Sequence, residues 1–147
     1  MWTTQHQDTT PVASNFVWDA LEALHSGTAL GPESDSFTLH GPFAVGTTLT
    51  ITPQGQDPME STIVALEPGR AYADETRFGD LILTFRHDLV PSDAGGTEVT
   101  HSLTIDGAGA DEVGPELGPQ ISADFPSAMH ELLNAARRLS EGEAIEA

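Results

Sequence analysis

The sequence predicts a single α+β domain in which a curved antiparallel sheet of about six to seven strands wraps a long C-terminal helix. Three observations carry this prediction. The apolar residues recur with a helical period over residues 14–25, alternate from 36 to 106, and return to a helical period after 107–118. Short turns separate the alternating segments, which favours an antiparallel meander. The final helical stripe is the only predicted element long enough to cover an apolar face of such a sheet.

The N-terminal part predicts a strand followed by one or two short helices. Residues 2–9 read as a polar opening strand, and Ser14 with Asn15 marks a helix start. A short amphipathic helix is expected over 14–25, because apolar residues recur there at helical spacing: Val17, Trp18, Leu21 and Leu24. Glycine and proline end this helix, and residues 26–35 form either a loop or a second short helix.

The alternating region divides into six predicted strands. Residues 48–52 show the pattern most clearly, because a threonine follows each apolar residue. The segments between the strands are rich in Gly, Pro and Asp, the residues that turns require. The predicted strands span residues 37–40, 48–52, 61–66, 71–78, 81–90 and 97–105.

The C-terminal part predicts one long helix. Its apolar residues lie three or four positions apart and define a single stripe: Leu117, Ile121, Phe125, Met129, Leu132, Leu133, Ala136 and Leu139. Pro126 lies inside the stripe and should kink the helix or mark its restart. Residues 140–147 are polar and are expected to fray. We see no linker, so 1–147 is expected to be one domain.

The composition excludes several classes of partner. The chain of 147 residues carries 23 acidic residues against five arginines, so phosphate backbones and anionic membranes are poor partners. The absence of cysteine excludes disulfides and thiolate metal sites. No apolar run approaches the roughly 20 residues of a membrane span, and the N-terminus lacks a basic-then-apolar signal. A cytoplasmic monomer or homodimer that contacts neither nucleic acid nor membrane is expected.

Several stretches, taken in order, resemble the START-like (SRPBCC) superfamily of helix-grip proteins, the polyketide cyclase/dehydrase-like group. No single motif carries the resemblance; order and spacing do. It implies a pocket between sheet and helix for a small, largely apolar ligand, without a cofactor. The same fold hosts cyclases, lipid carriers, hormone receptors and activators of chaperone ATPases, so it does not define a function. The matching stretches are residues 10–21, 39–48, 64–70, 83–89, 96–101 and 105–107.

Two histidines are predicted to meet on the inner face of the last hairpin. Alternation places His87 on the apolar face of 81–90 and His101 on the apolar face of 97–105. If Leu89 pairs with Val99, then His87 lies directly opposite His101, with Cβ atoms about 4.5–5.5 Å apart. An adjacent, inward pair of imidazoles is therefore expected.

The histidine pair has three possible roles. Two imidazoles can act as acid and base near neutral pH. The resemblance implies that such a pair could serve aldol cyclisation and dehydration of a polyketone. The other two roles are contact with a bound ligand and a structural one, with both rings hydrogen-bonded at the pocket rim.

The strand 71–78 adds two polar candidates, Tyr72 and Asp74. Both share a face with Phe78, which favours an inward orientation. A buried carboxylate needs a partner, and His87 or His101 could supply it; alternatively, Asp74 lies near a strand end in water. Tyr72 could orient a ligand carbonyl. His87, His101 and Asp74 also make up a two-His-one-carboxylate set, but we expect no metal.

Two functions follow from these residues. The first is a small-molecule pocket protein with His87, His101 and Tyr72 as polar contacts. It would be either a cofactor-independent cyclase, dehydratase or lyase, with His87, His101 and Asp74 as catalytic residues, or a carrier or sensor. The second is a protein-interaction module of the chaperone-ATPase-activator type with an exposed apolar patch above about 400 Å². The expected apolar lining of the pocket is Leu83, Phe85, Val99, Leu103, Phe125 and Met129.

Overall fold

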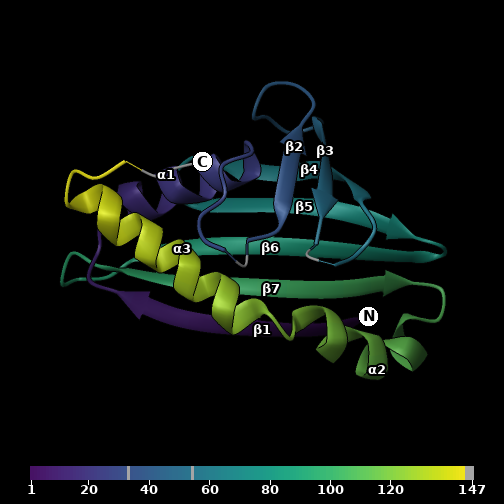
Figure 1. Cartoon of the computed structure of the whole chain (residues 1–147). Coiled ribbons are helices and arrows are strands. Elements are labelled where there is room, and N and C mark those ends of the chain that lie inside the picture. Colours follow the sequence, from purple (N-terminus) through teal and green to yellow (C-terminus); the bar gives the residue numbers. More distant parts are fainter. Residues whose placement is uncertain (33, 54, 145–147) are drawn as a thin grey trace.

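The computed structural model of the chain describes residues 1–32, 34–53 and 55–144 (Figure 1). Strands and helices alternate only at the N-terminus, and the two C-terminal helices follow an unbroken series of strands. In chain order the elements are β1 (Trp2–Thr10), α1 (Ser14–His25), β2 (Ser36–Leu39), β3 (Thr48–Thr52), β4 (Met59–Glu67), β5 (Ala71–Phe78), β6 (Leu81–Pro91), β7 (Thr97–Gly107), α2 (Ala110–Ser122) and α3 (Phe125–Ser140).

The strands form one seven-stranded antiparallel sheet in the order β1-β7-β6-β5-β4-β3-β2. The chain starts at one edge, crosses to the other edge through α1, and returns strand by strand, so that β7 pairs with β1. A register shift between Ile63 and Ala65 in β4 marks a bulge, which bends a strand and strengthens its twist. The α+β class and the curved antiparallel sheet are thus confirmed.

The N-terminal helix and the strands follow the predicted positions closely. The predicted bounds of α1, β3 and β5 are those observed, and the other strands differ from prediction by one or two residues at an end. Residues 26–35 form a loop rather than a second short helix, because the described residues of this stretch contain no helix. Glu33 lies outside the described residues.

The predicted C-terminal stripe forms two helices, because the helix restarts at Pro126, one of the two outcomes expected for that proline. Residues 123–124 separate α2 from α3, and Pro126 lies in the first turn of α3, where its missing N–H costs no hydrogen bond. Figure 1 shows α3 lying diagonally across the sheet, with α2 beyond its N-terminal end. Residues 145–147 of the predicted frayed tail lie outside the described residues. None of the described helices has the length and apolarity needed to cross a bilayer.

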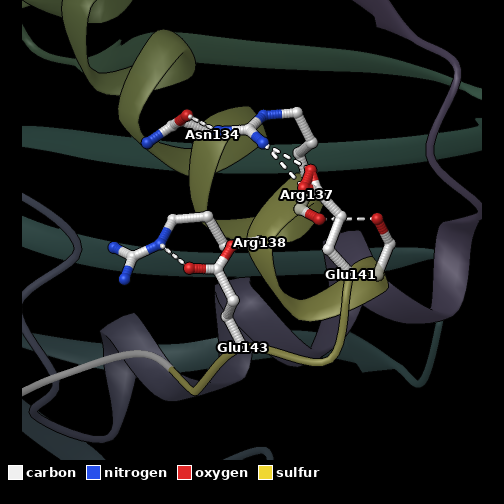
Figure 2. Close-up of polar contacts among 6 residues, drawn as sticks. Asn134, Arg137, Arg138, Glu141 and Glu143 are labelled. Atoms are coloured by element: carbon white, nitrogen blue, oxygen red, sulfur yellow. Dashed lines mark hydrogen bonds and ion pairs between the residues drawn. The ribbon is translucent and has the colours of Figure 1, made fainter.

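Exposed polar contacts hold the last turn of α3 (Figure 2). Arg137 Nη1 donates to Glu141 Oε1 at 2.5 Å, and Arg137 Nη2 donates to Asn134 Oδ1 at 2.9 Å. Arg138 and Glu143 form a looser ion pair at 3.7 Å. Two cations at a helix C-terminus also interact favourably with the helix dipole. Exposed pairs of this kind contribute only about 0.3–0.5 kcal/mol each, so they fix the helix end rather than the fold.

The core consists of two hydrophobic clusters that meet at the middle of β6 and β7. The larger cluster joins α1 and α3 to the sheet and includes Leu89 and Val99. The smaller cluster lies near α2 and includes Leu83 and Leu103. On each strand the position between the clusters on the inner face is a histidine, His87 or His101. The fold therefore places the histidine pair at the boundary between two apolar regions.

Trp2 of β1 packs against the glycines of α2. A Cβ atom built at Gly114 or at Gly118 would overlap the Trp2 side chain, so the helix approaches the strand only because both positions lack one. The indole belongs to the periphery of the smaller cluster. Glycine normally weakens a helix interior, but here it allows the indole to contact the helix backbone.

Gly118→Ala should therefore lower stability. Overlap with a packed side chain costs about 1–3 kcal/mol, which exceeds the roughly 1 kcal/mol that alanine gains over glycine in a helix interior. Urea denaturation of the variant measures the free energy of unfolding. The exposed control Glu116→Ala, on the same helix, should stay within about 0.5 kcal/mol of wild type. A Gly118→Ala protein as stable as wild type would contradict the proposed contact.

Candidate functional site

The two histidines of the last hairpin lie side by side, as predicted. His87 of β6 pairs directly with His101 of β7, and Leu89 pairs with Val99. The two imidazoles stack with ring centroids 4.0 Å apart and an interplanar angle of 17°. The alternation of apolar residues predicted that both histidines face inward, and the assumed pairing of Leu89 with Val99 made them direct partners.

Aromatic rings extend the pair on both sides. Phe125, at the start of α3, stacks on His101 at 3.8 Å and 20°. His87 and Phe125 are both nearly parallel to His101 and would overlap if they lay on the same face of it. The His101 ring therefore lies between the other two rings. On the other side His25, the last residue of α1, meets His87 edge-on with centroids 6.0 Å apart.

His25 is a site residue that the sequence analysis missed. It is 3% exposed, its Nδ1 donates to the Leu21 carbonyl at 2.8 Å, and its ring lies 4.1 Å from that of Tyr72. With Nδ1 as the donor, the neutral ring keeps a lone pair on Nε2. Its spacing of four from Leu21 continues the apolar stripe of α1, and this signal could have placed it inside.

Burial keeps these imidazoles neutral. It lowers the pKa of His25 to about 4 and that of His101 to about 3. Burial also lowers the pKa of His87 well below its ordinary value, and the neighbouring His101 and His25 add to this effect. At pH 7 each ring therefore has one N–H donor and one acceptor nitrogen.

Asp74 faces inward but does not bind a histidine. It is 2% exposed, its Oδ2 accepts from the Tyr72 hydroxyl at 2.8 Å, and its Oδ1 accepts from the Ser61 hydroxyl at 3.0 Å. Burial raises the pKa of Asp74 to about 6, against the effect of these two hydrogen bonds. Neither alternative left open for Asp74 holds, because the carboxylate is buried rather than in water and its partners are Tyr72 and Ser61 rather than a histidine. The Tyr72 proton is likewise committed to Asp74 rather than directed at a ligand.

Two residues at the centre of the inner face of β6 are less buried than their neighbours. Leu83 and Leu89 are each 3% exposed, whereas Phe85 and His87 between them are only partly buried. All four share one face of one strand, so the difference arises from the side chains of Phe85 and His87. Burial lowers the pKa of His87, so its ring lies mainly among protein atoms although the residue keeps some exposure.

The remaining predicted lining residues are tightly packed. Val99 and Leu103 are fully buried, Met129 is 1% exposed, and Phe125 is 4% exposed. Together with Leu83 they belong to the two core clusters. These side chains surround the histidines, and among the ten predicted site residues Phe85 and His87 are the two that are partly exposed.

Two cavities lie away from the predicted site. One of about 830 Å³ is lined by residues 55–62 and 75–78 together with Thr48. The other, of about 230 Å³, lies between the end of β1 and α3. None of the ten predicted site residues lines either one. Within the described residues, no group of three or more His, Cys, Asp or Glu is placed to hold a metal ion.

Solved structures resemble the chain over nearly its whole length. The ZhuI aromatase/cyclase from Streptomyces sp. R1128 is 15% identical with a TM-score of 0.71, covering 97% of this chain and 98% of that one. Norcoclaurine synthase from Thalictrum flavum, in complex with dopamine and hydroxybenzaldehyde, is 13% identical with a TM-score of 0.70, covering 97% and 88%. Ara h 8.0201 is 18% identical with a TM-score of 0.62, covering 91% and 93%. No family model matches the sequence, and a search of curated proteins finds no match.

The chain has the helix-grip fold of START-like (SRPBCC) proteins. At 13–18% identity these likenesses show the fold alone. The resemblance inferred from the order of the sequence stretches is confirmed at this level. What the chain binds has to be argued from its own residues.

The buried histidines should make stability fall in acid. Because the folded pKa values of His25 and His101 lie below the ordinary 6.5, the unfolded chain binds more protons below about pH 6.5. The free energy of unfolding should fall from there to about pH 4, by up to about 1.4 kcal/mol per pH unit for each histidine. Asp74 acts in the opposite direction, because its raised pKa adds stability as the pH falls from 6 towards 3.8.

His101→Phe isolates one of these contributions. Phenylalanine keeps the stack with Phe125 and removes His101 Nδ1, which is buried without a hydrogen-bond partner. Urea denaturation between pH 7 and pH 4 should show a shallower loss of stability, by about one proton. Thr100→Val, on the opposite face of the same strand, removes no titratable group and should keep the wild-type slope. Equal slopes in wild type and His101→Phe would contradict the pKa assignment.

Proposed function

We propose that the protein binds a small, largely apolar molecule between the sheet and α3, with its polar group at His87. The observation that carries this proposal is the partial exposure of Phe85 and His87 on the inner face of β6, between two hydrophobic clusters. Small-molecule sites typically combine apolar walls with a few converging polar groups. The bound dopamine and hydroxybenzaldehyde in a norcoclaurine synthase of the same fold also support the proposal.

The walls of this site are apolar and its polar groups are uncharged. Phe85 contacts the ligand, while Leu83, Val99, Leu103, Phe125 and Met129 enclose the space. The neutral rings of His25, His87 and His101 offer hydrogen bonds without a formal charge. A charged ligand group would lose its hydration without gaining an ion pair, so the site favours neutral aromatic, polyketide-like or lipid-like molecules.

The geometry also suits removal of a proton from a carbon next to a carbonyl. The pKa of His101 is about 3 and burial also lowers the pKa of His87, so both rings are weak bases at neutral pH. A neutral imidazole can still donate its N–H to a carbonyl oxygen as negative charge develops there. In the proposed step His87 accepts the proton from carbon, and the hydrogen bond to the developing negative charge on oxygen offsets the low basicity of the His87 ring. Asp74 acts as a positioning residue, since it holds the Tyr72 hydroxyl and the Tyr72 ring packs against His25.

A matched pair of ligands tests the binding proposal. 2-Naphthol and naphthalene share an aromatic body, and only the first forms hydrogen bonds. His87→Leu should weaken 2-naphthol about tenfold, the equivalent of one buried hydrogen bond, and leave naphthalene within about twofold. Saturation-transfer NMR or calorimetry on the full chain measures both. Equal affinity of wild type and His87→Leu for 2-naphthol would refute contact with His87.

Hydrogen exchange at a carbon acid tests the catalytic proposal separately. 2-Tetralone exchanges its α-protons slowly in D₂O, and NMR follows the loss of signal. Wild-type protein should accelerate this exchange, and His87→Leu should reduce the acceleration by about 10²-fold or more. His101→Leu should reduce it while retaining ligand binding. If the α-protons of 2-tetralone exchange no faster with wild-type protein than in buffer, the catalytic proposal is wrong and the binding proposal alone remains.

A further inference from the structure

We propose a second ligand site, in the 830 Å³ cavity between β4 and β5, for a small neutral or cationic molecule that combines a hydroxyl or carbonyl oxygen with an apolar body. This site is separate from the histidine site and stands independently of it. Its volume lies within the roughly 300–1,000 Å³ typical of small-molecule pockets.

The cavity lies where the sheet opens between two neighbouring strands. The pairing of β4 with β5 ends at Ser61 and Thr76, although both strands continue beyond these residues. Met59 instead stays paired with β3, and Phe78 stays paired with β6. The two halves of the sheet therefore separate, and residues from both faces of β4 line the opening.

Two neighbouring hydroxyl groups lie at the closed end of the opening. Ser61 and Thr76 are direct cross-strand partners, so their side chains lie on the same face. Each is 2% exposed, and Thr76 Oγ1 is buried without a hydrogen-bond partner. Ser61 Oγ donates its proton to Asp74 and keeps a lone pair.

An oxygen-bearing ligand would satisfy the orphaned hydroxyl. A buried polar group without a partner is costly. Thr76 lines the cavity, and a rotation about its χ1 can turn Oγ1 towards a ligand there. A ligand carbonyl can then accept from Thr76. A ligand hydroxyl can accept from Thr76 and also donate to Ser61.

The other lining residues define the ligand body and its charge. Met59 and the 59%-exposed Phe78 provide apolar contact at the mouth. Three carboxylates also line the cavity: Asp57, Glu60 and Glu75. They face one cation, Arg77, which pairs with Glu75 at 3.4 Å. The surplus of negative charge repels anions, so a neutral or cationic molecule fits best.

Two naphthalene dyes provide the test. Prodan is neutral and has a carbonyl oxygen, whereas 1-anilinonaphthalene-8-sulfonate is anionic. Titration of the full chain should give saturable, blue-shifted prodan fluorescence, part of which depends on Thr76, and no comparable binding of the sulfonate. Thr76→Val keeps the side-chain shape without the hydroxyl and should weaken prodan about tenfold. Phe78→Ala should also weaken it, because it removes the aromatic contact.

Two controls locate the dye. Val90→Ala truncates an equally exposed apolar side chain that lines neither cavity, and it should leave prodan affinity unchanged. Thermal unfolding confirms that Thr76→Val is folded, as expected when an unpartnered hydroxyl is removed. The proposal is overturned if prodan does not bind, or if neither Thr76→Val nor Phe78→Ala weakens it. Loss of prodan binding in His87→Leu alone would place the dye in the histidine site and also overturn this proposal.

Discussion

Polar groups buried within the concave face of the sheet are the constraint on which the rest of the structure depends. His87, His101 and Asp74 lie where two hydrophobic clusters meet, and each would cost free energy if buried without partners. Ring stacking stabilises the buried histidines, and two hydroxyl groups donate hydrogen bonds to Asp74. The cost is only partly offset, since His101 Nδ1 and Thr76 Oγ1 have no partner. Stability alone does not account for polar atoms left in this state, which is why both proposals place ligands beside them.

The helices determine how much of the concave face is closed. Because the C-terminal stripe breaks at residues 123–124, Phe125 begins a new helix and its ring can stack on His101. α2 is then free to pack its glycines on Trp2 and to close the smaller cluster. α1 contributes His25 from the opposite side. A single straight helix could not have reached both clusters and the histidine pair on a curved sheet.

The chemistry available at the site follows from burial. Imidazoles with strongly lowered pKa values act at neutral pH as hydrogen-bond partners rather than as cations, which favours neutral ligands. The carboxyl group with a pKa near the physiological range, Asp74, is enclosed by Tyr72 and Ser61. It links the two proposed sites, because Tyr72 packs towards the histidines while Ser61 lines the cavity between β4 and β5.

The sequence by itself determined the helix-grip architecture, most element bounds and the contact of His87 with His101. These follow from local periodicity, which fixes the face of each side chain, and from the short loop between β6 and β7, which limits the register of that hairpin. Only the tertiary structure decided that His25 of α1 reaches the pair, that Ser61 rather than a histidine is bonded to Asp74, and that β4 and β5 part beyond Ser61 and Thr76. Such contacts join elements far apart in the chain, and their geometry depends on sheet curvature and helix placement, which no local pattern encodes.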